Sequence, residues 1–104
     1  MLIVRPEAET DIADVGGWYE DQVPGLRGEF LKALDETIQS IEQNPGLYAR
    51  VHGELRRALT PRFPYGVFYL ARTERIVVFA VLHTARDPRI WKRRARARGK
   101  PALR

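Results

Sequence analysis

The spacing of the apolar residues changes once along this 104-residue chain, and that change limits the fold more than any other feature. Up to about residue 45 the apolar residues recur every three or four positions, which is the period of an amphipathic helix. From residue 55 they alternate with polar residues or form continuous runs, which is typical of strands. A chain with helices first and strands afterwards is expected to fold as an α+β domain.

The first half of the chain predicts a short strand and two helices. Residues 2–4 are a β-rich run that ends before Pro6, a residue well suited to the first position of a helix. The first predicted helix covers about residues 6–21, and the second runs from Leu26 to about Asn44. Because the turn between them is short, we expect the two helices to form an antiparallel hairpin.

The second half predicts three strands, at about residues 55–60, 65–71 and 76–82. The last run contains no polar residue, which indicates an interior strand covered on both faces. Asp87 followed by Pro88 predicts the N-cap and first residue of a short helix that leads into a basic tail.

We therefore expect one domain spanning residues 1–104, with residues 92–104 as the basic tail. Its N-terminal strand should join a mostly antiparallel sheet of about four strands, and the helical hairpin should lie on one face of that sheet. The short helix at the C-terminus completes the predicted fold.

Charge is distributed very unevenly along the chain. Residues 1–54 hold 4 basic and 11 acidic groups, whereas residues 86–104 hold 9 basic groups and 1 acid. Of the 18 basic residues, 15 are arginine, whose planar guanidinium matches phosphate and carboxylate groups. The charge pattern therefore favours a polyanionic partner, which is either a nucleic acid, an assembly that carries one, or an acidic protein segment.

The composition excludes several classes of function. With no cysteine, the chain has neither thiolate chemistry nor a cysteine zinc site, and we expect it to use no metal and no cofactor. The motifs of P-loop, dinucleotide-binding, zinc-protease and serine-hydrolase sites are absent. The sequence has no apolar run long enough to span a membrane and no signal peptide, so we expect a cytoplasmic protein.

Side chains that could carry chemistry are few, and most of them are arginines. His83 is the stronger of the two histidine candidates, because it ends the most apolar predicted strand, where a sheet delivers functional side chains. We expect five arginines to converge on the sheet face that the helices leave uncovered, where they would bind phosphate groups. These are Arg56, Arg57, Arg62, Arg86 and Arg89.

The order and spacing of several segments resemble the RelE/ParE superfamily of bacterial toxins, and within it the ParE branch. The resemblance covers almost the whole chain and rests on Pro6 after the opening strand, the helix end at 44–46, the strand at 55–57, and the stretches 63–69 and 83–91. It implies a toxin that a small ParD-like antitoxin neutralises by wrapping a segment over its surface. It also implies a cytoplasmic heterotetramer or larger complex, which binds operator DNA only through the antitoxin.

Two cellular targets are known for toxins that this chain resembles. In a ribosome-dependent mRNA endonuclease of the RelE type, the matching residues would be Arg56, Arg57 and Arg86, with His83 as the base. The position nearest the catalytic tyrosine of that branch is Trp91, whose indole N–H cannot shuttle a proton. This departure favours the ParE type, which poisons DNA gyrase by binding it and needs no catalytic residues.

Our first hypothesis is therefore a gyrase-binding toxin, the second is the endonuclease, and a third is an inactive toxin kept as a partner for its antitoxin. The resemblance implicates the C-terminal region in target binding, and there we expect Arg86, Arg89, Trp91, Arg93 and Arg94. We expect the antitoxin to present an acidic amphipathic peptide to exposed aromatic residues and arginines. The expected antitoxin-binding residues are Arg56, Arg57, Arg62, Phe63, Tyr65 and Tyr69.

Overall fold

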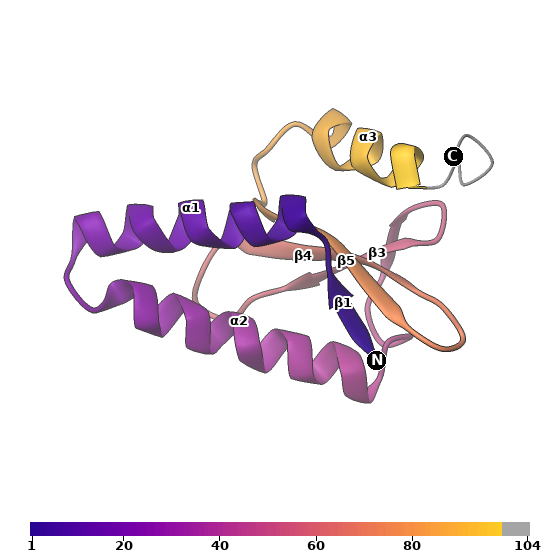
Figure 1. Ribbon diagram of the computed structural model, residues 1–104, viewed down its shortest axis with the longest axis horizontal. Helices are drawn as coiled ribbons and strands as arrows, with labels where there is room; N and C mark the ends of the chain where they lie inside the picture. The colour runs from indigo at the N-terminus through magenta and orange to yellow at the C-terminus, as the bar shows by residue number, and fades with distance from the viewer. Residues whose placement is uncertain (99–104) are drawn as a thin grey trace.

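The computed structural model describes the backbone of residues 1–98 and the side chains of residues 1–96. The chain begins with strand β1 (Leu2–Val4) and continues into helices α1 (Pro6–Gln22) and α2 (Leu26–Gln43). The two helices run side by side as an antiparallel hairpin (Figure 1). The predicted strand and helical hairpin are therefore confirmed.

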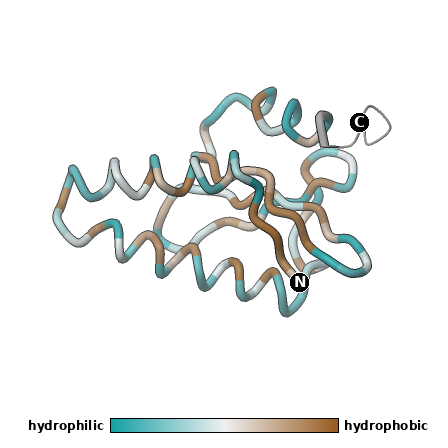
Figure 2. Tube along the Cα trace, in the orientation of Figure 1, coloured by the Kyte–Doolittle hydropathy of each residue, from teal (hydrophilic) through white to brown (hydrophobic). Residues whose placement is uncertain are grey.

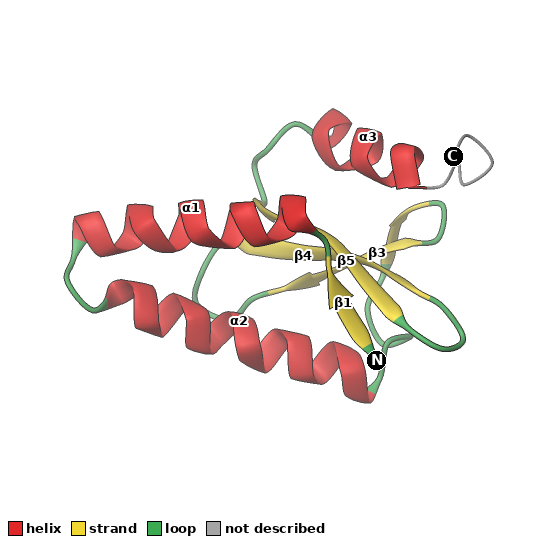
Figure 3. Ribbon diagram, viewed as in Figure 1, coloured by secondary structure: helices red, strands yellow, loops and turns green. Residues whose placement is uncertain are grey.

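The rest of the chain forms four strands and a helix, and the order of the sheet is β1-β5-β4-β3-β2. Figure 3 draws the strands in yellow and the helices in red. Strand β1 pairs with β5 in parallel, and the other neighbouring strands are antiparallel. The bounds are β2 (Arg50–His52), β3 (Leu55–Leu59), β4 (Tyr65–Ala71), β5 (Ile76–His83) and α3 (Pro88–Arg98).

The sheet thus has five strands where the sequence predicted about four, and the additional one is β2 (Arg50–His52). This strand is three residues long, two of them exposed, and it pairs with β3 across an irregular register. So short a segment shows no alternation of apolar and polar residues, which explains why the periodicity did not predict it.

The hairpin packs on one face of the sheet and buries the larger of two apolar clusters. Helix α2 contributes Phe30, Leu34 and Ile41, and β5 contributes Val78 and Val81. Aromatic rings meet at the end of the hairpin near the α1–α2 turn, where the ring centroids of Phe30 and Phe63 are 5.5 Å apart.

Helix α3 covers part of the opposite face, where a second apolar cluster forms. Phe79, Ala80 and Leu82 of β5 belong to this cluster together with Trp91 of α3. Strand β5 is therefore buried on both faces, as the unbroken apolar run predicted. Figure 2 shows the contrast in hydropathy, because the strands are largely apolar while α3 is mostly hydrophilic.

The basic tail, predicted over residues 92–104, is helical as far as Arg98, and residues 99–104 lie outside the described part of the chain. None of the described helices is both long and apolar enough to cross a bilayer.

Candidate functional site

The first turn of α3 is fixed by Asp87, which lies at the N-cap position predicted for it. One carboxylate oxygen accepts the backbone N–H of Arg89 at 2.9 Å, and the other accepts from the Arg89 guanidinium at 2.6 and 2.9 Å. The hydrogen bonds from Arg89 lower the pKa of the Asp87 carboxyl to about 2. Asp87 therefore begins the helix and at the same time holds the Arg89 side chain.

Trp91 packs against the sheet and fixes the position of α3. Only 7% of its surface is exposed, and its ring stacks on Phe68 of β4 with centroids 4.8 Å apart. His52 of β2 meets the same indole edge to face at 6.5 Å. Trp91, predicted to bind a target, therefore lies in the core and positions the helix that carries the exposed arginines.

An ion pair between helices α3 and α1 also attaches α3. Asp11 accepts from the guanidinium of Arg94 at 2.7 and 3.2 Å, and both side chains are largely shielded from solvent. Asp11 also accepts the backbone N–H of Val81, while Arg94 donates to the carbonyl of Phe79 at 3.2 Å.

The position of this ion pair follows from the shortness of β1, which pairs with β5 only as far as Val78. Beyond that point β5 has no strand beside it on this edge within the described chain, so its backbone groups need other partners. Asp11 supplies the acceptor and Arg94 the donor. The pair therefore covers a sheet edge as well as holding α3.

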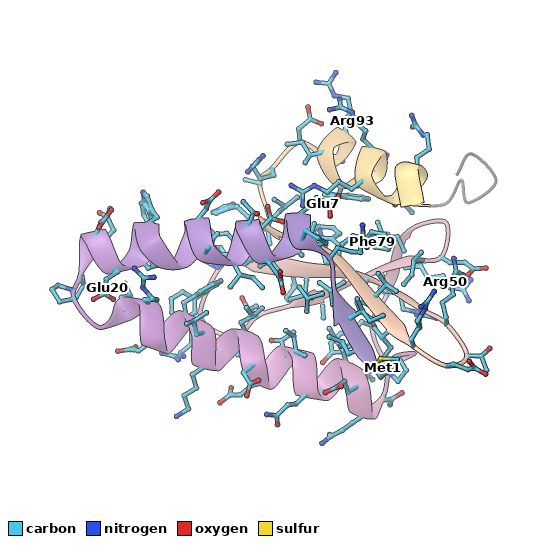
Figure 4. All side chains as sticks on the ribbon, in the orientation of Figure 1. Met1, Glu7, Glu20, Arg50, Phe79 and Arg93 are labelled. Atoms are coloured by element: carbon cyan, nitrogen blue, oxygen red, sulfur yellow. The ribbon has the colours of Figure 1, made fainter. Side chains whose placement is uncertain are left out.

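Three of the predicted target-binding residues lie on the outer surface. Arg86 is exposed in the loop between β5 and α3, and Arg89 is 82% exposed in its side chain although paired with Asp87. Arg93 projects from the side of α3 that faces away from the sheet (Figure 4). The predicted target-binding group is thus divided between exposed cations and two anchors, Trp91 and Arg94.

An aromatic hollow of about 490 Å³ lies between the C-terminal half of α1 and the strand ends. It is lined by Trp18, Tyr19, Pro64, Tyr65 and His83, and Trp18 is 56% exposed. A smaller hollow of about 110 Å³ continues from it, since Tyr65 and His83 line both.

The second hollow brings charge beside the aromatic rings, because Arg86 lines it together with Asp11 and Asp14 of α1. Burial raises the pKa of the Tyr65 hydroxyl, and the positive charge of Arg86 opposes part of that rise. His83 accepts the backbone N–H of Ala85 through Nδ1 at 2.9 Å, which leaves Nε2 as the nitrogen free for another contact.

The prediction that five arginines converge on one sheet face is wrong. Arg56 points toward the hairpin face and donates to the carbonyl of Tyr48, whereas Arg57 leans over Gly66 on the opposite face. Successive residues of a strand point to opposite faces, so this pair cannot meet. Arg62 lies in the β3–β4 loop with φ of 67° and pairs with Glu29 of α2.

The residues predicted for an endonuclease are consequently dispersed. His83 and Arg86 line one hollow, but Arg57 lies across the sheet from them, and Arg56 lies beside the loop that follows α2. No reacting group placed beside His83 would reach all the cations of that set.

Of the aromatic residues expected on the antitoxin surface, Phe63 and Tyr65 are half-buried beside Tyr19, with ring centroids 5.0 and 6.1 Å away. The expectation of an exposed Tyr69 is wrong. Its side chain is fully buried and its hydroxyl donates to the carbonyl of Pro45 at 2.6 Å. Burial raises the pKa of this hydroxyl.

Sequence reasoning missed two residues of this region, Trp18 and Asp11. Trp18 lies at the edge of the apolar stripe of α1. A large aromatic ring outside the buried stripe of a helix indicates an exposed apolar surface, and this could have pointed to Trp18. Asp11 lies 83 positions before its partner Arg94, and no local pattern links the two.

Among the described residues, no group of histidine and acidic side chains is arranged to hold a metal ion.

Comparison with known proteins gives one family. The model of the ParE toxin of the type II toxin–antitoxin system parDE matches residues 2–88, a match that ends at the first residue of α3. No curated protein sequence matches the chain.

Among solved structures, a chain of the chromosomal ParDE TA system from P. aeruginosa has the same fold, with a TM-score of 0.70 at 14% sequence identity. The alignment covers 79% of this chain and 92% of that one. Since the family match extends over most of the chain, this protein belongs to the ParE toxin family of type II toxin–antitoxin systems.

Proposed function

We propose that this ParE toxin acts by binding DNA gyrase through its C-terminal region and that a ParD-like antitoxin neutralises it. The observation that carries the proposal is the way α3 packs against the rest of the protein. Trp91 and Arg94 hold one side of the helix to the body, and this leaves Arg89 and Arg93 exposed on the other. An exposed cationic helix on a rigid base is suited to binding an acidic surface.

The residues of this proposal have two roles. Arg86, Arg89 and Arg93 would contact the target, because their side chains are exposed on the loop and helix. Trp91 and Arg94 would position the helix without touching the target. The dispersed placement of His83, Arg56 and Arg57 favours binding over RNA cleavage, since a cleavage site needs its cations around one reacting phosphate.

The test is binding of the full-length toxin to purified gyrase by surface plasmon resonance without DNA, followed by a supercoiling assay. The variant Arg86→Ala/Arg93→Ala should weaken gyrase binding at least about tenfold, as expected when exposed charged contacts are truncated. Lys32→Ala/Arg75→Ala, which removes two exposed charges elsewhere, is the matched control. Equal affinity of wild type and Arg86→Ala/Arg93→Ala would exclude this surface.

A deletion of residues 92–104 tests the same region in cells. It should abolish toxicity while leaving antitoxin binding largely intact, and unchanged toxicity would contradict the proposal. Codon-positioned cleavage of mRNA by the toxin with translating ribosomes, lost in His83→Ala, would instead establish the endonuclease.

For the antitoxin, the aromatic hollow beside Trp18 and Tyr65 is the surface that the proposal assigns to the apolar side of its peptide. Arg62 lies over the ring of Phe63, which contacts Tyr19 of this hollow, and Arg86 lines the smaller hollow beside it. Both arginines would meet acidic residues of the same peptide. The similar P. aeruginosa chain belongs to a ParDE system, which agrees with such a partner.

Trp18→Ala should raise the dissociation rate of the antitoxin, because a large exposed ring at an interface is a frequent hot spot. Raising salt from about 50 to about 500 mM should slow association, because exposed charges are screened. Unchanged rates in both experiments would place the antitoxin elsewhere. Light scattering of the purified complex would test the proposed heterotetramer or larger assembly.

A further inference from the structure

A group of cations lies on the outer side of α3. Arg89, Lys92, Arg93 and Arg96 surround a shallow hollow of about 180 Å³, and they are the residues of the described chain that line it. They lie at intervals of three or four positions, so they share one side of the helix. With a rise of about 1.5 Å per residue, the row from Arg89 to Arg96 extends about 10 Å. We call these four residues the basic face.

The body of the protein keeps the basic face turned outward. Trp91 and the half-buried Ile90 and Ala95 lie in the apolar cluster beneath the helix, and Arg94 is tied to Asp11. Figure 4 shows Arg93 directed away from the sheet. The four cations are therefore presented together on a supported helix.

Little negative charge opposes them. Asp87 is the one acid among residues 86–104, and Arg89 pairs with it. Within residues 1–96, whose side chains are described, Lys92, Arg93 and Arg96 form no salt bridge. Of the four cations of the basic face, Arg89 is paired with Asp87, and the other three carry charge that no salt bridge within residues 1–96 neutralises.

We propose that the basic face is a binding site for the phosphate backbone of double-stranded DNA, so that the toxin itself contacts DNA. Guanidinium groups bind phosphate oxygens through paired hydrogen bonds, and a row of about 10 Å reaches more than one phosphate along a strand. This site shares Arg89 and Arg93 with the surface proposed to bind gyrase, but it would bind DNA in the absence of gyrase.

The lining of this hollow suits a phosphate backbone, whereas the proposed gyrase contact also uses Arg86, which lies outside the basic face. A stable protein interface has an apolar centre from which charged residues are depleted, and the described lining of the basic face holds no apolar residue. Binding to a phosphate backbone needs only cations at the right spacing. The aromatic hollow beside Trp18 has the opposite lining, so the two surfaces are suited to different partners.

The test is fluorescence anisotropy of two unrelated fluorescein-labelled duplexes of about 20 base pairs, titrated with the full chain between about 50 and 200 mM salt, without gyrase or antitoxin. Wild type should bind both duplexes alike, because backbone contacts carry no sequence information. The variant Lys92→Gln/Arg93→Gln/Arg96→Gln should lose at least about tenfold in affinity, and its salt slope should fall by about 3, one for each lost phosphate contact.

The matched control is Lys32→Gln/Arg50→Gln/Arg75→Gln, which removes the same net charge from exposed positions on other elements. It should lose less than about threefold if contacts rather than net charge decide binding. The charge-preserving variant Arg93→Lys/Arg96→Lys should keep most of the affinity for DNA. Such a result would show that substitution at these positions does not by itself disrupt the fold.

Three results would overturn the proposal: equal losses in the two glutamine variants, no loss in either, or equally tight binding of an acidic polyglutamate peptide. Because the assay contains no gyrase and no antitoxin, its failure would leave the proposed function standing. A failure of gyrase binding would likewise leave a positive result for DNA unaffected.

Discussion

The helical hairpin and α3 cover opposite faces of the same sheet, yet they are held there by very different contacts. Helices α1 and α2 place several buried apolar side chains against the sheet, including Ala8, Phe30 and Leu34. Among the described side chains of α3, Trp91 alone is buried, the half-buried Ile90 and Ala95 pack beside it, and Arg94 forms an ion pair with Asp11. The hairpin is thus part of the core, whereas α3 is attached to it by a small number of contacts.

The charges of these two regions differ as much as their packing. The hairpin carries most of the acids of the chain, whereas six of the eleven residues of α3 are basic and none is acidic. Most of the described surface of α3 does not pack against the core, so its side chains are available for binding. The comparison therefore assigns stability to the hairpin and recognition to α3.

The largest expected effect comes from removing a ring from the hairpin core. Phe30 is fully buried and meets Tyr19, Phe63 and Tyr65 with ring centroids within 5.6 Å. Phe30→Ala should lower the free energy of unfolding by about 3–5 kcal/mol, measured by urea denaturation. Leu31→Ala, at a position 40% exposed, should change it by less than about 1 kcal/mol.

A smaller loss is expected from Trp91→Ala, because opening α3 leaves the hairpin and the sheet packed. The free energy of unfolding should fall by about 2 kcal/mol, which is less than the usual effect of removing a tryptophan from a core. The decrease cannot exceed the free energy with which α3 packs on the rest of the protein. Hydrogen exchange should quicken in 88–98 and stay slow in α1 and α2. Trp18→Ala, which removes the same ring from the surface, is the control. Faster exchange throughout would show that α3 and the hairpin unfold as one unit.

The ion pair should contribute less than the stacked indole. Arg94→Ala should cost about 1 kcal/mol, and Asp11→Ala should cost more than Arg94→Ala but less than Trp91→Ala, because Val81 also loses its acceptor. A double-mutant cycle should give a coupling of about 1 kcal/mol between the two positions. A coupling near zero would mean that Trp91 alone seats the helix.

Much of this fold could be predicted from periodicity, because helices and long strands bury one face along many residues. The hairpin, β4, β5 and the cap at Asp87 all carry such local signals, and the structure contains each of them. Strand β2 could not be predicted in this way, since three residues give no period and pairing with β3 decides their conformation.

The candidate site was less predictable, because it depends on contacts between distant segments. Because side chains alternate along a strand, the sequence of β3 already places Arg56 and Arg57 on opposite faces. The wrong prediction that they converge could therefore have been avoided from the sequence. The pairing of Asp11 with Arg94, and the burial of Trp91 on Phe68, instead depend on where α3 lies on the sheet. No spacing within the chain specifies that position.

The smallest expected effect compares one carboxylate from each region. Asp87 caps α3, and its pKa is lowered to about 2 first by the side chain and then by the backbone N–H of Arg89. Glu20 in the hairpin accepts the backbone N–H groups of Gly25 and Arg27 at the start of α2, which also lowers its pKa. Both carboxylates are therefore stabilised in the charged form by the folded chain.

Because folding lowers the pKa of Asp87, the contribution of its carboxylate is complete above about pH 3.8 and is lost as the pH falls through about 2. In carboxyl NMR titrations, Arg89→Gln should move the midpoint of Asp87 up toward its ordinary value and leave that of Glu20 unchanged. A midpoint of Asp87 that stays near 2 in this variant would show that the helix backbone, rather than the arginine, dominates the cap. Such a result would make α3 resemble the hairpin, where hydrogen bonds from backbone N–H groups are the largest cause of the lowered pKa of Glu20.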